Sequence, residues 1–179
     1  MSSVDRKVTR RVAVDALFLV LALALSYIEV LIPIGNLVPL PGFKLGLANI
    51  LIMILLWRVG ISDGAVVSSL RVLIMGLLFG TPVSIFFSFG GALFSFLVLV
   101  LLKRLSGRFV SFIGVSVLSA SAHNIGQLIC AGILFDFRVV FSYLPLLLIA
   151  SVVFGAVSGV IVNRIYPSLE KIKLEGYNL

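Results

Sequence analysis

The chain has 179 residues, of which 61% are hydrophobic and 12% are charged, and its mean hydropathy is +1.26. These values lie outside the range of soluble globular domains and predict one integral membrane domain over residues 1–179. The formal charge is +7, but the basic residues lie at the ends of apolar segments without interleaved aromatics, so we expect no nucleic-acid partner. The single cysteine, Cys130, excludes a disulfide framework and a cysteine-based metal site.

A window of about 19 residues moved along the chain predicts six apolar spans. Each is close to the roughly 20 residues that a helix needs to cross the hydrocarbon core of a bilayer. A closed β-barrel would instead need short segments of alternating polarity, which these unbroken apolar runs do not contain. We therefore expect an all-α bundle of six transmembrane helices in contact with the lipid bilayer. The predicted spans are Ala13–Pro33, Lys44–Trp57, Gly64–Phe79, Pro82–Leu102, Val110–Phe135 and Val140–Ile165.

Basic residues divide unequally between the two sides of such a bundle. When the loops are assigned alternately, eleven basic residues lie on one side and two, Lys44 and Arg138, on the other. Positive charge is enriched on the cytoplasmic side of membrane proteins, so both termini, the basic segment 1–11 and the tail 166–179, are predicted to be cytoplasmic. The eleven residues are Arg6, Lys7, Arg10, Arg11, Arg58, Lys103, Arg104, Arg108, Arg164, Lys171 and Lys173.

Polar side chains inside the predicted spans gather between the bilayer centre and the outer surface. Hydrogen bonds that merely join helices are useful at any depth, so a preference for one leaflet indicates a cavity that opens outward. Ionisable groups within spans face a bundle interior or a water-filled cavity. We expect a small-molecule substrate to bind there, between the first, second, third and fifth spans. The residues concerned are Glu29, Lys44, Asn49, Arg71, His123, Asn124 and Gln127.

The segment "SASAHNIGQL" supplies three of these residues. His123, Asn124 and Gln127 are spaced three and four residues apart, which places them on one sector of a helix and predicts that they read the ligand by hydrogen bonding. The structural alternative is that they join helices. Arg71 is costly to bury, and the sequence leaves open whether it contacts a ligand anion or pairs with Glu29.

Two further residues complete the predicted site. Asn49 is predicted to assist the three residues of "SASAHNIGQL", and Lys44 lies at the mouth of the second span, where an interfacial anchor is the commoner role. Glycines outside the site, Gly90, Gly91, Gly155 and Gly159, predict close packing of helices.

Sequence signatures of catalysis are absent. The chain contains no GxxxxGK[ST] phosphate loop, no HExxH, no CxxC, no GxSxG and no DDxxD arrangement that holds magnesium against a diphosphate. We therefore expect no catalytic residue, no metal and no cofactor, and we expect that the protein is not itself an enzyme.

Five segments carry a resemblance to a known family. In chain order they are "LALALSYIEVLIP", "PGFKLGLANI", "LRVLIMGLLFG", "FSFGGALFS" and "SAHNIGQL". Over roughly Ala13–Ile165 the chain resembles the bacterial family called Gx transporter or heptaprenyl diphosphate synthase component I. That family in turn looks like the substrate-binding S components of energy-coupling factor (ECF) transporters. The resemblance implies a bundle in the bacterial inner membrane that captures a small molecule and works with an ECF coupling protein and two ATPase subunits.

The family's second name implies an alternative. The chain would then be a non-catalytic membrane accessory subunit in polyprenyl diphosphate or quinone-precursor metabolism, beside a separate catalytic subunit. Prenyl chain elongation needs Asp-rich magnesium sites, which this sequence lacks. The S-component resemblance implies an AxxxA seam on the first helix for docking the coupling protein, and there only Ala22 and Ser26 have that spacing.

Overall fold

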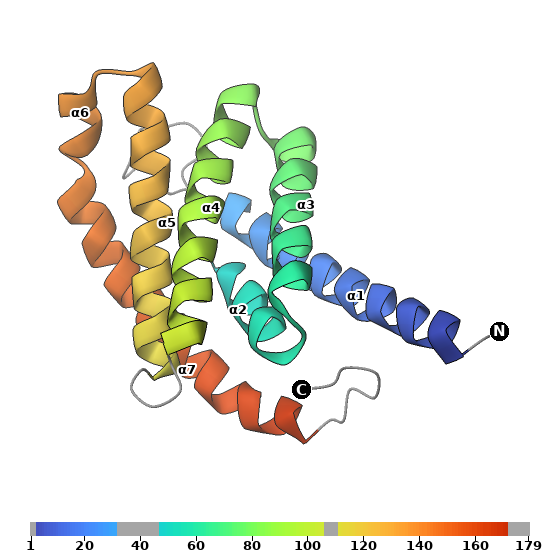
Figure 1. Cartoon of the computed structure of the whole chain (residues 1–179). Coiled ribbons are helices and arrows are strands. Elements are labelled where there is room, and N and C mark those ends of the chain that lie inside the picture. Colours follow the sequence, from blue (N-terminus) through green and yellow to red (C-terminus); the bar gives the residue numbers. More distant parts are fainter. Residues whose placement is uncertain (1–2, 32–46, 106–110, 172–179) are drawn as a thin grey trace.

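A computed structural model describes residues 3–31, 47–105 and 111–171, and in these ranges the chain folds into helices and short turns without any β-strand. This confirms the all-α prediction for the described residues. In chain order the helices are α1 (Ser3–Leu31), α2 (Asn49–Arg58), α3 (Ile61–Phe79), α4 (Pro82–Leu105), α5 (Phe112–Leu134), α6 (Phe137–Phe141) and α7 (Leu144–Glu170), as shown in Figure 1.

The long helices match five of the six predicted spans. α1, α3, α4, α5 and α7 are each long and apolar enough to cross a membrane, which indicates a multi-pass membrane protein. α1 begins at Ser3, ahead of the predicted start, because the helix continues through the basic segment. The predicted sixth span, Val140–Ile165, begins inside the short α6 and continues, after a turn at residues 142–143, in α7. The number of spans and the side on which the termini lie stay predictions.

The second predicted span differs from the described helix. α2 has 10 residues, which gives a length of about 15 Å, half the thickness of a hydrocarbon core. Its side chains are buried on all sides: Ile52, Met53, Leu55 and Leu56 are at most 2% exposed. A helix that is apolar all round is a core helix, and a hydropathy window does not separate it from a span.

Glycines let three helices approach each other closely. A Cβ added at Gly155 of α7 would lie 2.7 Å from the Cα of Val117 on α5, and one added at Gly90 of α4 would lie 2.9 Å from the carbonyl oxygen of Gly126 on α5. Neither position has room for a side chain. The predicted close packing is therefore confirmed at these two glycines, and α5 is held between α4 and α7.

One end of the bundle is joined by charged groups. The Arg11 guanidinium donates to both carboxylate oxygens of Asp63, at 2.6 and 2.8 Å, and so connects α1 to the start of α3. The Lys103 ammonium at the end of α4 donates to the carbonyl oxygen of Leu56, near the end of α2. α4 and α7 both end in the lower half of Figure 1. The other end, toward the end of α1 and the start of α4, contains the polar cavity.

Candidate functional site

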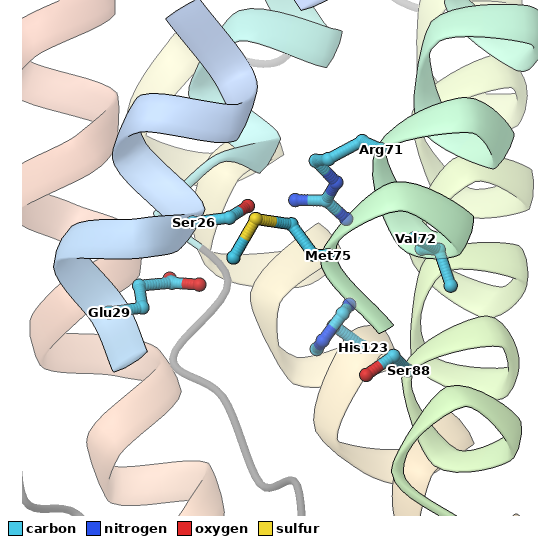
Figure 2. A pocket seen from close by; sticks show the side chains of 7 residues that line it. All are labelled: Ser26, Glu29, Arg71, Val72, Met75, Ser88 and His123. Atoms are coloured by element: carbon cyan, nitrogen blue, oxygen red, sulfur yellow. The ribbon is translucent and has the colours of Figure 1, made fainter. Parts of the chain in front are cut away.

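Three helices bring ionisable side chains to one buried cavity. Glu29 comes from α1, Arg71 from α3 and His123 from α5, and Figure 2 shows their polar ends turned toward a common space. The cavity has a volume of about 10 Å³, which is room for about one water molecule. A larger ligand therefore requires the lining side chains to move apart. The other lining residues are Ser26, Val72, Met75 and Ser88.

Arg71 is the most costly of these groups to bury. It is 5% exposed, and among the residues that the structure describes none forms a hydrogen bond with its guanidinium; Glu29 acts on it through charge alone. A guanidinium has five N–H donors in a fixed planar arrangement that matches carboxylate and phosphate oxygens. Arg71 is therefore suited to an anion entering the cavity.

Glu29 has a structural contact as well as a charge. Its carboxylate accepts a hydrogen bond from the backbone N–H of Leu47, just before α2, and the residue is 4% exposed. This contact fastens the end of α1 to the beginning of α2. The negative charge of Glu29 also balances the positive charge of Arg71 in the cavity. An incoming anion therefore gains from Arg71 and is opposed by Glu29.

His123 is positioned by a glycine on the neighbouring helix. It is 2% exposed, and a Cβ at Gly91 of α4 would lie 2.9 Å from its Nε2 atom. The missing side chain at residue 91 therefore makes the space in which the imidazole lies. The hydroxyl of Ser88, one turn along α4, lines the same cavity and has no hydrogen-bond partner among the described residues.

Gln127 lies one helical turn beyond His123. Its Cγ atom also packs against Gly91, and the side chain is 3% exposed. Neither amide atom has a hydrogen-bond partner within the described ranges. Leaving a buried polar group unsatisfied costs about 1–3 kcal/mol, so such a group calls for a partner. Gln127 is outside the cavity lining, and its predicted role in binding stays a prediction.

Asn49 and Asn124 are engaged in contacts between helices. The Asn49 amide donates to the Ser95 hydroxyl on α4 at 2.9 Å. The Asn124 amide donates to the Leu147 carbonyl oxygen at 3.0 Å and to the Ser151 hydroxyl at 2.7 Å, both on α7. Asn124 is therefore directed toward α7 and not into the cavity that His123 lines, so the three residues of "SASAHNIGQL" do not meet at one place.

The binding roles of His123, Asn124 and Gln127 stay predictions. The contacts observed for Asn124 are those of the structural alternative, in which the residue joins helices. Lys44, the seventh predicted residue, lies outside the described residues.

Four cavity residues were not predicted from the sequence, namely Ser26, Val72, Met75 and Ser88. Ser26 is three residues before Glu29, and Met75 is four residues after Arg71, so both occupy the same helix face as a predicted residue. This spacing is the signal that identifies them. Ser88 had no such signal, because its position depends on how α4 packs against α5.

The chemistry available in the cavity is that of a binding site. It offers a guanidinium, an imidazole, a carboxylate and two hydroxyls, which together recognise a polar or anionic group. No cluster of three or more His, Cys, Asp or Glu side chains suited to a metal ion occurs in the part of the chain that the structure describes.

Comparison with known proteins identifies the family. The sequence profile of the family described as heptaprenyl diphosphate synthase component I matches residues 18–165, which is most of the chain. No curated protein and no solved structure matches the chain. The match confirms the family resemblance noted from the sequence, and it covers all of the residues that form the cavity. The chain belongs to the heptaprenyl diphosphate synthase component I family.

Proposed function

We propose that the protein is a non-catalytic, membrane-embedded subunit in polyprenyl diphosphate metabolism, and that it binds the anionic head of an isoprenoid. The observation that carries this proposal is Arg71, a buried guanidinium that lines a cavity and has no hydrogen bond from any described residue. The family name supports the class of ligand, because it refers to a component of a heptaprenyl diphosphate synthase.

The electrostatics of the cavity define how such a head would bind. Arg71 would contact phosphate oxygens through two parallel N–H donors, the arrangement that makes guanidinium–phosphate pairs strong. His123 and Ser88 would add hydrogen bonds from α5 and α4. The negative charge of Glu29 repels the anionic head and therefore weakens its binding.

Chain elongation itself would belong to a separate subunit. The sequence has no Asp-rich magnesium site, and the cavity holds one carboxylate, Glu29. A subunit of this kind would hold or deliver a substrate at the membrane, where its apolar chain is soluble. A quinone precursor that carries an isoprenoid chain would use the same cavity.

A binding measurement tests this proposal. The purified protein in lipid nanodiscs is titrated with inorganic pyrophosphate, and the same titration is made with Arg71→Gln. The matched control is Arg58→Gln, which removes another buried guanidinium, 6% exposed, at the far end of α2. Wild type and R58Q are expected to bind and R71Q to bind at least tenfold more weakly. Equal binding by R71Q and wild type would refute the proposed role.

A second candidate is a subunit for uptake of a polar small molecule with an ECF coupling protein and two ATPase subunits. The observation in its favour is the set of buried polar residues on the predicted outer half of the bundle. One structural feature counts against it. Ala22 and Ser26, the pair with the docking spacing, are 0% and 2% exposed, so they are covered by the bundle itself. Co-purification with ATPases supports uptake, whereas co-purification with a prenyl synthase supports the first candidate.

A further inference from the structure

A second hollow lies beside the polar cavity, on the outer face of the bundle between α3 and α4. Its volume is about 300 Å³, which is the lower end of the range for small-molecule pockets. It extends from Ala65 and Leu97 at one end to Val72 and Phe89 at the other. Seven residues of helix correspond to about 10 Å, so the hollow is an elongated groove. We call it the α3–α4 groove.

The α3–α4 groove is open along its side and closed at its base. Phe89, Leu93 and Leu97 form its rim and are 47%, 45% and 56% exposed, whereas Ser68 and Ala92 at its base are 6% and 7% exposed. In a bundle surrounded by lipid, this open side faces hydrocarbon. An apolar chain can therefore enter the groove directly from the bilayer without passing through water.

Val72 lies between the α3–α4 groove and the polar cavity. It lines both spaces, and it follows Arg71 in the sequence. Figure 2 shows the guanidinium of Arg71 directed into the cavity and the side chain of Val72 on another side of α3. Val72 is 3% exposed, so its side chain is buried between the polar cavity and the lipid-facing groove.

We propose that the α3–α4 groove holds the isoprenoid chain of a prenyl diphosphate whose head lies in the polar cavity beside Arg71. Val72 stands between the two parts of the ligand and changes rotamer when the ligand passes. The identity of the chain as an isoprenoid rests on the function proposed above. That an apolar chain lies in this groove rests on its lipid-facing opening, its apolar rim and its position next to the cationic cavity, with which it shares the lining residue Val72.

The α3–α4 groove explains how a protein with a small polar cavity can bind a long amphiphile. The polar cavity has room for about one water, so the apolar part of any such ligand must lie elsewhere. Of the described residues that line the cavity, Val72 also lines the lipid-facing groove.

Substitutions that fill the groove test this proposal. Ala92→Phe fills its base and Ser69→Trp covers its rim, so a failure of the first variant to fold leaves the second as a test. The matched control is Leu77→Trp, which adds the same ring to α3 at a position that is 78% exposed and outside the groove. Each protein in nanodiscs is titrated with farnesyl diphosphate and, separately, with inorganic pyrophosphate.

The two titrations separate this proposal from the function on which it rests. Wild type and L77W are expected to bind farnesyl diphosphate at least tenfold more tightly than pyrophosphate, and the groove variants should lose that advantage while keeping pyrophosphate affinity. Unchanged farnesyl diphosphate affinity in the groove variants would overturn the groove proposal and leave the head site intact. Absence of binding of both probes to wild type would overturn the proposed function.

A photoreactive farnesyl diphosphate gives an independent result. A diazirine on the isoprenoid chain is expected to label α3 within residues 65–72 and α4 within residues 89–97. Labelling confined to other helices, with binding retained, would overturn the placement of the chain.

Discussion

The imidazole of His123 on α5 lies so close to Gly91 on α4 that a Cβ at residue 91 would come within 2.9 Å of its Nε2 atom. The same Cβ would lie 2.8 Å from the Cγ atom of Gln127. One missing side chain therefore makes space for both polar residues of α5. The proposed head site depends on this contact between α4 and α5 as much as on the polar residues themselves.

Replacing Gly91 by alanine is expected to displace His123 and weaken binding of pyrophosphate by about tenfold, with a loss of about 1–3 kcal/mol in the free energy of unfolding from overpacking. Gly90→Ala is the matched control, because its Cβ would meet the Cys130 side chain and the Gly126 carbonyl oxygen instead. It should lose comparable stability and keep its affinity. Equal affinities of folded G91A and G90A would contradict this role for Gly91.

Replacing Glu29 by glutamine is expected to strengthen binding of pyrophosphate. The change removes the negative charge that opposes the anion and retains an oxygen for the Leu47 N–H. It also leaves the charge of Arg71 uncompensated in the empty protein, so the melting temperature should fall and recover when pyrophosphate binds. Weaker binding by E29Q, measured by titration calorimetry, would mean that Glu29 contacts the ligand favourably.

Asn124→Leu is expected to lower stability, whereas Gln127→Leu is not. The Asn124 amide makes two hydrogen bonds to α7, so its loss should lower the free energy of unfolding by about 1 kcal/mol. The Gln127 amide has no partner among the described residues, so Q127L should leave stability unchanged or higher. Thermal unfolding in one detergent measures both. A larger loss in Q127L than in N124L would contradict the observed hydrogen bonding.

The contact between Arg11 and Asp63 is expected to stabilise the packing of α1 on α3. Asp63 is buried, but Arg11 is half exposed, so a coupling energy of about 1 kcal/mol is expected. A double-mutant cycle with Arg11→Gln and Asp63→Asn isolates this energy from the other contacts of each residue. A coupling energy near zero would show that the ion pair does not hold α1 in place.

The helical class and five of the long helices could be predicted from the sequence, because they depend on composition and on long apolar runs. The family could be predicted from five characteristic segments. Glu29, Arg71 and His123 could also be singled out, because ionisable residues within spans are rare, and the structure brings these three to one cavity. The direction of the Asn124 side chain could not be predicted from the sequence. Helical spacing places a residue on a broad sector, but the packing of α7 against α5 determines that Asn124 turns toward Ser151.

The second predicted span shows a different limit, which concerns the use of hydropathy to predict transmembrane helices. The apolar run before Arg58 has the hydropathy of a span, but in the structure it forms a helix enclosed by its neighbours. A hydropathy window measures apolar content and does not report whether lipid or protein surrounds a helix. The α3–α4 groove could not be inferred either, because it depends on which side chains of two helices face each other.

The central claim is that Arg71 receives the anionic head of a ligand, and titration calorimetry of pyrophosphate tests it most directly. Wild type, Arg71→Gln and the charge-balanced double variant Arg71→Gln/Glu29→Gln are compared in nanodiscs. Hydrogen bonds to a charged group contribute about 1.5–3 kcal/mol, so R71Q should bind about 10 to 100 times more weakly than wild type. The double variant also lacks the opposing carboxylate of Glu29, so it should bind more tightly than R71Q but still more weakly than wild type. Wild-type affinity in the folded double variant, or no binding by wild type, would contradict the claim.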